Sequence, residues 1–153
     1  MFEIQVLYDD GFFELVLSAT LRVIYLRRSP RSFRDQAEWT GAYARATREI
    51  ARFAQPGWRL FYDLRLARGR NDREFEEATA EYRRRLLTLL DPCAVIVRSA
   101  AGQMQVGRHI REVGSAARVF FDLRTAVSKL GLPMAVADAL DAQEPEIRLV
   151  VNR

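Results

Sequence analysis

The sequence predicts a single α/β domain with a mixed β-sheet, in which antiparallel N-terminal strands are followed by β-α units. Two observations along the chain support this class. Short apolar segments separated by turns fill the first 28 residues, and buried-strand patterns then alternate with amphipathic helices. In addition, 153 residues with 49% hydrophobic and 29% charged side chains match the size and composition of one globular domain.

The N-terminal segment predicts three antiparallel strands. Ile4, Val6 and Tyr8 alternate with Glu3, Gln5 and Leu7, and Asp9-Asp10-Gly11 is typical of a turn. Two more apolar runs follow at residues 12–17 and 21–26, with Ser18-Ala19-Thr20 between them. Each run is long enough for one strand, and each connection is short enough for a hairpin.

A long helix is expected next. Ser32, with Asp35 three residues later, resembles a capping box at its start. Gln55-Pro56-Gly57 predicts its end. Apolar residues recur at helical spacing between these signals: Trp39, Tyr43, Ala46, Ile50 and Phe53.

Three β-α units are predicted after this helix. The strands are short apolar runs at residues 58–62, 93–97 and 119–121, a pattern typical of strands covered on both faces. The helices after them are expected to begin near Asn71 (with Glu74 as the second capping residue), Ser99 and Asp122. Gly131 predicts the end of the last of these helices.

The C-terminal residues are predicted to form an extension packed on the same domain. We place the α/β domain at residues 1–131 and the extension at residues 132–153. Residues 134–140 favour a short helix, and residues 147–151 favour an edge strand or an arm docked on a partner.

Hydropathy, cysteine content and charge distribution predict a cytoplasmic protein without a nucleic-acid partner. No apolar run reaches the ~20 residues of a transmembrane helix, no signal peptide is visible, and one cysteine cannot form an internal disulfide. The net charge is +4 and the pI about 9.7. Basic residues are interleaved with acids, as in Arg73-Glu74 and Arg111-Glu112, whereas nucleic-acid binders gather their bases on one face.

The candidate site is an edge where strands end. Leu60-Phe61-Tyr62-Asp63-Leu64-Arg65 recurs as Val119-Phe120-Phe121-Asp122-Leu123-Arg124. Because ligands meet the carboxyl ends of parallel strands, the polar residues there could bind a partner or an anion. The alternative is structural, since Asp122 can cap a helix and arginines can neutralise buried acids. The candidate docking or anion-binding residues are Asp63, Arg65, Asn71, Arg98, Ser99, Asp122 and Arg124.

Catalytic and metal-binding patterns are not recognisable. His109, the only histidine, is expected to be an exposed or half-buried helix residue, and Cys93 to be a small core residue. No His/Cys/Asp cluster has metal-ligand spacing. We therefore expect no enzyme, cofactor or metal. The least favoured alternative is an enzyme that uses Asp63, Arg65, Asp122 and Arg124.

The order of these elements resembles the STAS-like family, in its bacterial anti-sigma-factor-antagonist-like or Sec14-like branch. The resemblance covers about residues 3–131. It rests on Leu60-Phe61-Tyr62-Asp63-Leu64-Arg65, Ala94-Val95-Ile96-Val97-Arg98-Ser99-Ala100-Ala101-Gly102 and Val119-Phe120-Phe121-Asp122. It implies a mixed sheet with helices mainly on one side, no catalysis, and work by docking other proteins. The stretch that matches the family's phosphorylation site, residues 63–73, has no hydroxyl, so no such switch is expected there.

Two functions follow as expectations. The first is a non-enzymatic regulatory, signalling or scaffold module that binds another protein or itself. Surface aromatics could serve its interface, with Phe12, Phe13, Trp39 and Tyr43 as candidates. The alternative is a Sec14-like carrier of a small molecule or lipid, which requires a cavity between sheet and helices.

Overall fold

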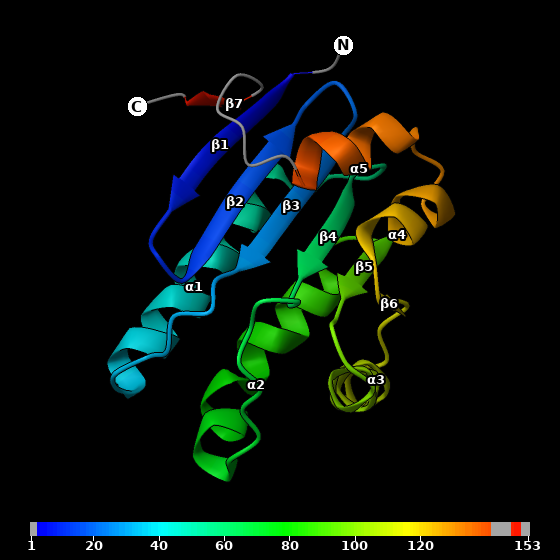
Figure 1. The fold of residues 1–153 in the computed structure, drawn as a ribbon. Coiled ribbons are helices and arrows are strands. Elements are labelled where there is room, and N and C mark those ends of the chain that lie inside the picture. The colour runs from blue at the N-terminus through cyan, green and yellow to red at the C-terminus, as the bar shows by residue number, and fades with distance from the viewer. Residues whose placement is uncertain (1–2, 142–147, 151–153) are drawn as a thin grey trace.

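The computed structural model describes residues 3–141 and 148–150, and the side chains of residues 3–141. The chain forms a mixed α/β domain (Figure 1). Its strands are β1 (Ile4–Asp9), β2 (Phe13–Ser18), β3 (Val23–Arg28), β4 (Arg59–Asp63), β5 (Cys93–Ile96), β6 (Arg118–Phe120) and β7 (Arg148–Val150). Its helices are α1 (Gln36–Phe53), α2 (Arg73–Thr88), α3 (Ala100–Val113), α4 (Leu123–Lys129) and α5 (Met134–Asp141).

The strands form one sheet in the order β6-β5-β4-β3-β2-β1-β7. β1, β2 and β3 are antiparallel neighbours, as the sequence predicts. β3, β4, β5 and β6 run parallel, in chain order, with a helix in each crossover. β7 pairs in parallel with β1, with Ile4 opposite Arg148, so the expected C-terminal strand is confirmed at residues 148–150.

Helices cover both faces of the sheet. The long helices α1, α2 and α3 lie on one face, and the short helices α4 and α5 on the other (Figure 1). Strand periodicity divides each strand between the two layers. In β4, Leu60 and Tyr62 join the core under α1–α3, whereas Phe61 joins the core under α4 and α5. Asp63 therefore falls on the α4–α5 face.

The structure confirms only some of the N-cap residues that the sequence predicts. Asp122 and Ser99 are N-caps as expected, accepting hydrogen bonds from the backbone N–H groups of Thr125 and Gly102. The prediction of Ser32 as the cap of α1 is wrong, because Asp35 caps it by accepting from the N–H of Glu38. Asn71 is also not a cap.

The cap of α2 is Asp72, one residue later, whose carboxylate accepts from the N–H of Phe75. α5 matches the predicted C-terminal helix, and Val136, Ala137 and Leu140 bury it against the sheet beside α4. Among the described residues, no helix is both long enough and apolar enough to cross a membrane.

The four aromatic residues proposed for a surface interface are buried, which corrects that prediction. Phe12, Phe13, Trp39 and Tyr43 are each at most 8% exposed. Their rings pack between the sheet and α1, for example with Phe13 and Tyr43 edge to face at 5.1 Å between centroids. They belong to the core under α1–α3, and Tyr43 also lines the cavity described below.

Candidate functional site

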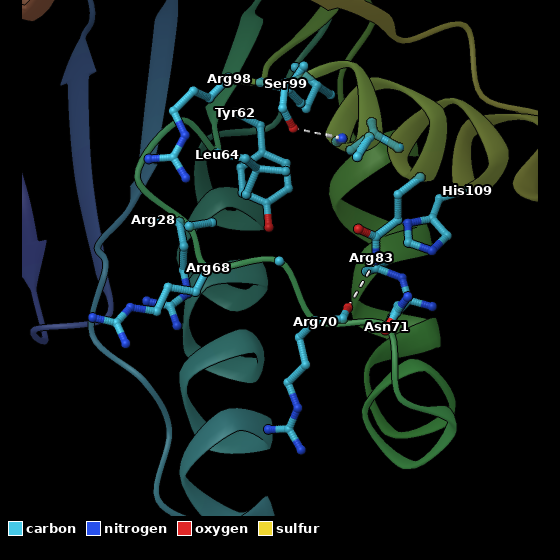
Figure 2. Close-up of a pocket in the computed structure, with 18 of the residues that line it drawn as sticks. Arg28, Tyr62, Leu64, Arg68, Arg70, Asn71, Arg83, Arg98, Ser99 and His109 are labelled. Carbon is cyan, nitrogen blue, oxygen red and sulfur yellow. Dashed lines mark hydrogen bonds between the residues drawn. The ribbon is translucent and has the colours of Figure 1, made fainter.

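A cavity of about 990 Å³ lies on the α1–α3 face, at the carboxyl end of the parallel strands (Figure 2). Its wall comes from the segments after β3, β4 and β5 and from α1, α2 and α3. This is the edge at which open α/β sheets bind ligands. The cavity also lies between sheet and helices, as the carrier alternative requires.

The charges on its wall have one sign. Eight arginines and His109 line the cavity, and among the described residues no Asp or Glu does. The arginines are Arg28, Arg31, Arg68, Arg70, Arg83, Arg98, Arg108 and Arg111. A water-excluding cleft lined by one sign of charge concentrates the field and attracts ions of the opposite sign.

The deep part of the cavity is apolar, with one polar pair. Tyr43 from α1 and Tyr62 from β4 are buried and hydrogen-bond to each other through their hydroxyls. Burial raises the pKa of both phenols, so both stay protonated at neutral pH. Phe33 and Phe75 flank Tyr43, with centroids 6.3 and 6.2 Å from its ring.

Glu76 neutralises the α2–α3 side of the cavity. Its carboxylate lies 3.0 Å from Arg83, 3.2 Å from Arg108 and 2.9 Å from His109 Nε2. It also accepts from the amide of Gln105 at 3.1 Å. Burial alone would raise the pKa of Glu76, but these donors and charges hold it below its usual value. Glu76 is therefore an ionised carboxylate set just behind the wall.

His109 corrects an expectation, because it is only 7% exposed. Burial lowers its pKa, and Arg83 adds to the effect. The ring is therefore neutral at pH 7, and Nε2–H donates to Glu76, because a carboxylate can only accept. His109 thus links α3 to α2 and presents an uncharged ring to the cavity.

The opposite side carries uncompensated charge. Figure 2 shows Arg28, Arg68 and Arg98 on one side of the cavity, away from Arg83 and His109. In the part of the chain that the structure describes, no carboxylate forms an ion pair with these three arginines.

Arg28 is the most constrained of these three arginines. It is 7% exposed, stacks on Phe33 at 4.4 Å, and donates to the backbone carbonyls of Phe12, Ser29 and Arg31. Burial lowers its pKa. Since its partners are neutral, its positive charge has no anion in contact among the described residues.

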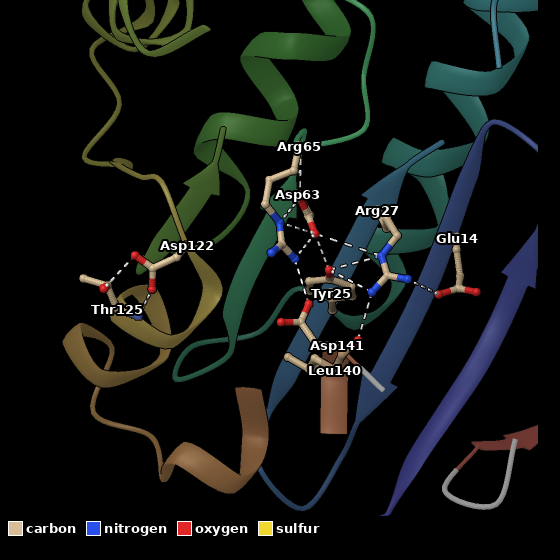
Figure 3. Close-up of polar contacts among 9 residues, drawn as sticks. All are labelled: Glu14, Tyr25, Arg27, Asp63, Arg65, Asp122, Thr125, Leu140 and Asp141. Carbon is tan, nitrogen blue, oxygen red and sulfur yellow. Dashed lines mark hydrogen bonds and ion pairs between the residues drawn. The ribbon is translucent and has the colours of Figure 1, made fainter. Parts of the chain in front are cut away.

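The residues predicted to share one edge lie on two faces of the sheet. Arg98, Ser99 and Asn71 line the cavity. Asp63 and Arg65 lie on the α4–α5 face in a separate network (Figure 3). Asp122 and Arg124 follow β6, which β5 separates from β4, so the two Asp-Leu-Arg segments do not adjoin.

Asp63 is the centre of the second network, and is 2% exposed. It accepts hydrogen bonds from the Tyr25 hydroxyl and from Arg65, whose Nη2 lies 2.8 Å away. Arg27 Nε is 4.0 Å from the same carboxylate. Burial would raise the pKa of Asp63, but the Arg65 and Tyr25 donors outweigh it and hold the pKa below its usual value.

The same network holds α5 against the sheet. Arg65 also contacts Asp141 at 2.8 Å, and Arg27 donates to the Leu140 carbonyl at 2.9 Å. Both acceptors lie at the end of α5 (Figure 3). These contacts are satisfied within the chain, so the arrangement stabilises the fold and leaves Asp63 little capacity to bind a ligand.

Asp122 and Arg124 also have structural partners. Asp122 caps α4 and accepts from the Thr125 hydroxyl at 2.9 Å, while Arg124 pairs with Asp138 of α5 at 2.6 Å. Both side chains of the latter pair are more than half exposed. These contacts fit the structural alternative for this segment, in which Asp122 caps a helix and the arginine pairs with an acid.

Sequence reasoning missed most of the cavity wall. Arg28, Arg68, Arg83 and Arg108 lie in four separate segments, and only the fold brings them together. Gly69 and Gly102 also line the cavity. Among the described residues, no group of three or more His, Cys, Asp or Glu is arranged to hold a metal ion.

Comparisons of the chain with protein-family models, with curated proteins and with solved structures found no match. The STAS-like resemblance therefore stays a prediction from the sequence motifs. The geometry of the cavity is the basis on which a function can be argued.

Proposed function

We propose that this protein is a non-enzymatic module that binds a small organic anion in the cavity on its α1–α3 face. One observation supports the proposal: eight arginines and no Asp or Glu among the described residues line the cavity wall. The proposal develops the carrier alternative and requires no cofactor. The volume of the cavity, about 990 Å³, lies at the upper end of the usual range for small-molecule sites.

Energetics favour an anion over a neutral ligand. Bringing like charges together in a partly enclosed space costs free energy, which a bound anion returns. Burial lowers the pKa of Arg28, so desolvation of this guanidinium is a further cost that a bound anion would offset. Glu76 offsets the charge of Arg83 and Arg108, but five of the eight arginines have no carboxylate partner among the described residues.

Calorimetric titration with three probes tests the proposal. Phenyl phosphate and benzoate supply anions with an apolar ring, and benzylamine supplies the same ring with a positive charge. We expect saturable binding of an anion, no binding of benzylamine, and an affinity that falls as salt is raised. Absence of saturable binding for both anions would contradict the proposal.

Variants localise the binding. Arg68→Gln with Arg98→Gln removes two unpaired charges from the wall and is expected to weaken the anion. The matched control is Arg52→Gln, which removes an arginine that pairs with Glu49 at the surface and does not line the cavity. Equal effects of the two changes would show that the anion binds elsewhere.

Protein docking is a second candidate. Leu66 and Phe121 are large apolar residues, 48% and 50% exposed, that follow β4 and β6. Exposed apolar side chains mark an interface when they form a contiguous patch, and the partner that we propose for these two is a second copy of this chain. Sedimentation velocity tests self-association. We expect a concentration-dependent dimer that Phe121→Ser abolishes, and a monomer at every concentration would refute self-association.

A further inference from the structure

Four of the five unpaired arginines of the cavity lie at or after the ends of β3, β4 and β5. Arg28 ends β3, Arg68 follows β4, and Arg98 follows β5. At the other end, Arg83 and Arg108 bond to Glu76, and Arg70 bonds to Asp72 at 2.6 Å. The fourth unpaired arginine, Arg31, also follows β3, whereas the fifth, Arg111, lies on α3. The anionic group of a ligand is therefore drawn to the ends of β3, β4 and β5.

These three arginines offer more donors than a carboxylate can use. Each guanidinium has five N–H donors in a planar fork. The bonds that Arg28 makes within the described residues use Nη1 and Nη2, so its Nε–H has no acceptor there. Arg68 and Arg98 make no side-chain hydrogen bond in the described part of the chain. A phosphate monoester has three terminal oxygens and nearly two negative charges, whereas a carboxylate has two oxygens and one.

The start of α3 adds donors to the same end. Ser99 caps the helix, and Ser99, Ala101 and Gly102 line the cavity. The Ser99 hydroxyl accepts from the Gly102 N–H at 3.1 Å, which leaves the N–H groups of residues 100 and 101 without an intrahelical partner. This 14-residue helix also directs the positive end of its dipole toward the arginines.

An apolar surface continues from this end. The guanidinium of Arg28 stacks on Phe33, whose ring is followed by those of Tyr43 and Phe75. Leu64 lines the same space, and Met104, which is 75% exposed, lies at the wall of the cavity on α3. An apolar ring attached to the anionic group would contact the buried rings of Tyr43 and Phe75 and would cover the still accessible parts of Phe33, Leu64 and Met104, which gains the free energy of burying that apolar surface.

We infer that the ligand is a phosphate monoester with an apolar, ring-bearing body, whose phosphate lies between Arg28, Arg68 and Arg98 and whose body lies along Phe33, Tyr43 and Phe75. This inference rests on the proposed function, because it assumes that the cavity binds an anion. It adds the chemical class of the anion and its orientation.

Calorimetry with phenyl phosphate, inorganic phosphate and benzoate tests the inference. We expect phenyl phosphate to bind on the order of tenfold more tightly than either of the others, since each lacks one of the two recognised groups. The double variant Arg68→Gln/Arg98→Gln should lose this preference. Arg68→Lys keeps the charge without the planar fork, and should retain part of the affinity.

Two controls accompany these variants, one for whether each variant is folded and one for where in the cavity the phosphate lies. Far-UV circular dichroism and a thermal melt show that each variant is folded before it is titrated. Arg108→Gln changes an arginine on the Glu76 side, and we expect it to affect phenyl phosphate less than the double variant does. A larger loss in Arg108→Gln would overturn the assigned orientation.

The titrations with benzoate and phenyl phosphate test the phosphate assignment separately from anion binding itself. If benzoate binds as tightly as phenyl phosphate, the cavity binds anions but the phosphate assignment is wrong. If neither binds, the proposed function fails as well. Vesicles of phosphatidylcholine with phosphatidic acid test the body of the monoester, because this lipid carries acyl chains and no ring. Binding of phenyl phosphate but not of the vesicles supports the ring-bearing body, whereas vesicle binding that the double variant loses would overturn that part of the inference.

Discussion

Replacing Asp63 by Asn should destabilise the fold without affecting the cavity. The substitution keeps the shape of the side chain but removes its charge. Asp63 is 2% exposed and balances Arg65 at 2.8 Å and Arg27 at 4.0 Å, and it accepts from the Tyr25 hydroxyl. An amide in its place would leave Arg65 with Asp141 and Arg27 with Glu14, 3.9 Å away, as the remaining countercharges in a partly buried environment.

The size of the effect follows from this geometry. Breaking a fully buried ion pair by removing one partner costs about 3–5 kcal/mol. Here the side chain of Arg65 is 27% exposed and keeps its contact with Asp141, so solvent and that carboxylate offset part of the loss. We expect about 2–3 kcal/mol less free energy of unfolding, which lowers the melting temperature of a domain this size by about 4–12 °C.

Urea denaturation followed by tryptophan fluorescence measures the change. Asp138→Asn is the matched control, because Asp138 pairs with Arg124 where both side chains are more than half exposed, and such pairs contribute about 0–1 kcal/mol. Equal stability of the two variants would refute the role assigned to Asp63.

The pH dependence is a second test of the same variant. Because the pKa of Asp63 is held below its usual value in the fold, its contribution is complete above the unfolded pKa of about 3.9 and is lost as pH falls through the folded pKa. The stability difference between wild type and Asp63→Asn should therefore shrink below about pH 4. A difference that stays constant down to the acid transition would contradict this linkage.

Three further predictions concern other residues. Since the pKa of His109 is lowered, the stability of the wild type should fall as pH drops below about 6.5; His109→Gln should flatten this slope in urea denaturation, and an unchanged slope would count against a buried neutral ring. Burial raises the pKa of the Cys93 thiol to about 12, so a disulfide reagent should react only after unfolding, and rapid labelling of the folded protein would refute this. Asp122→Ala should cost about 1 kcal/mol in a thermal melt because it removes the cap of α4, whereas Asp122→Asn should be nearly neutral; equal losses would show that the charge matters more than the cap.

The sequence predicted the elements of this fold because hydrophobic periodicity is local. The stripe on α1 and the buried runs of β4 and β5 appear where expected. The N-cap of α1 was harder to predict, because Ser32 and Asp35 lie three residues apart and the side chain of either can accept a hydrogen bond from the first N–H groups of a helix. In the structure it is the Asp35 carboxylate that accepts from the Glu38 N–H, at 2.9 Å.

The candidate site was harder to predict, because it depends on strand order and strand phase. Tyr62 and Asp63 are neighbours in the chain but point to opposite faces of β4, which period-two alternation alone could have indicated. The order β6-β5-β4 then separates the two Asp-Leu-Arg segments. No local pattern places Arg28, Arg68 and Arg98 at one end of a cavity, since each lies at or after the end of a different strand.

The most direct test of the account is an NMR titration of isotope-labelled protein with phenyl phosphate. Arginine Nε–H signals and backbone amides report on the wall of the cavity and on the start of α3. We expect saturable shifts at Arg28, Arg68 and Arg98 and at residues 99–102, with Arg52 and the Asp63 network unchanged. Shifts spread over surface arginines without saturation, or shifts centred on Arg65 and Arg124, would contradict an anion site in this cavity.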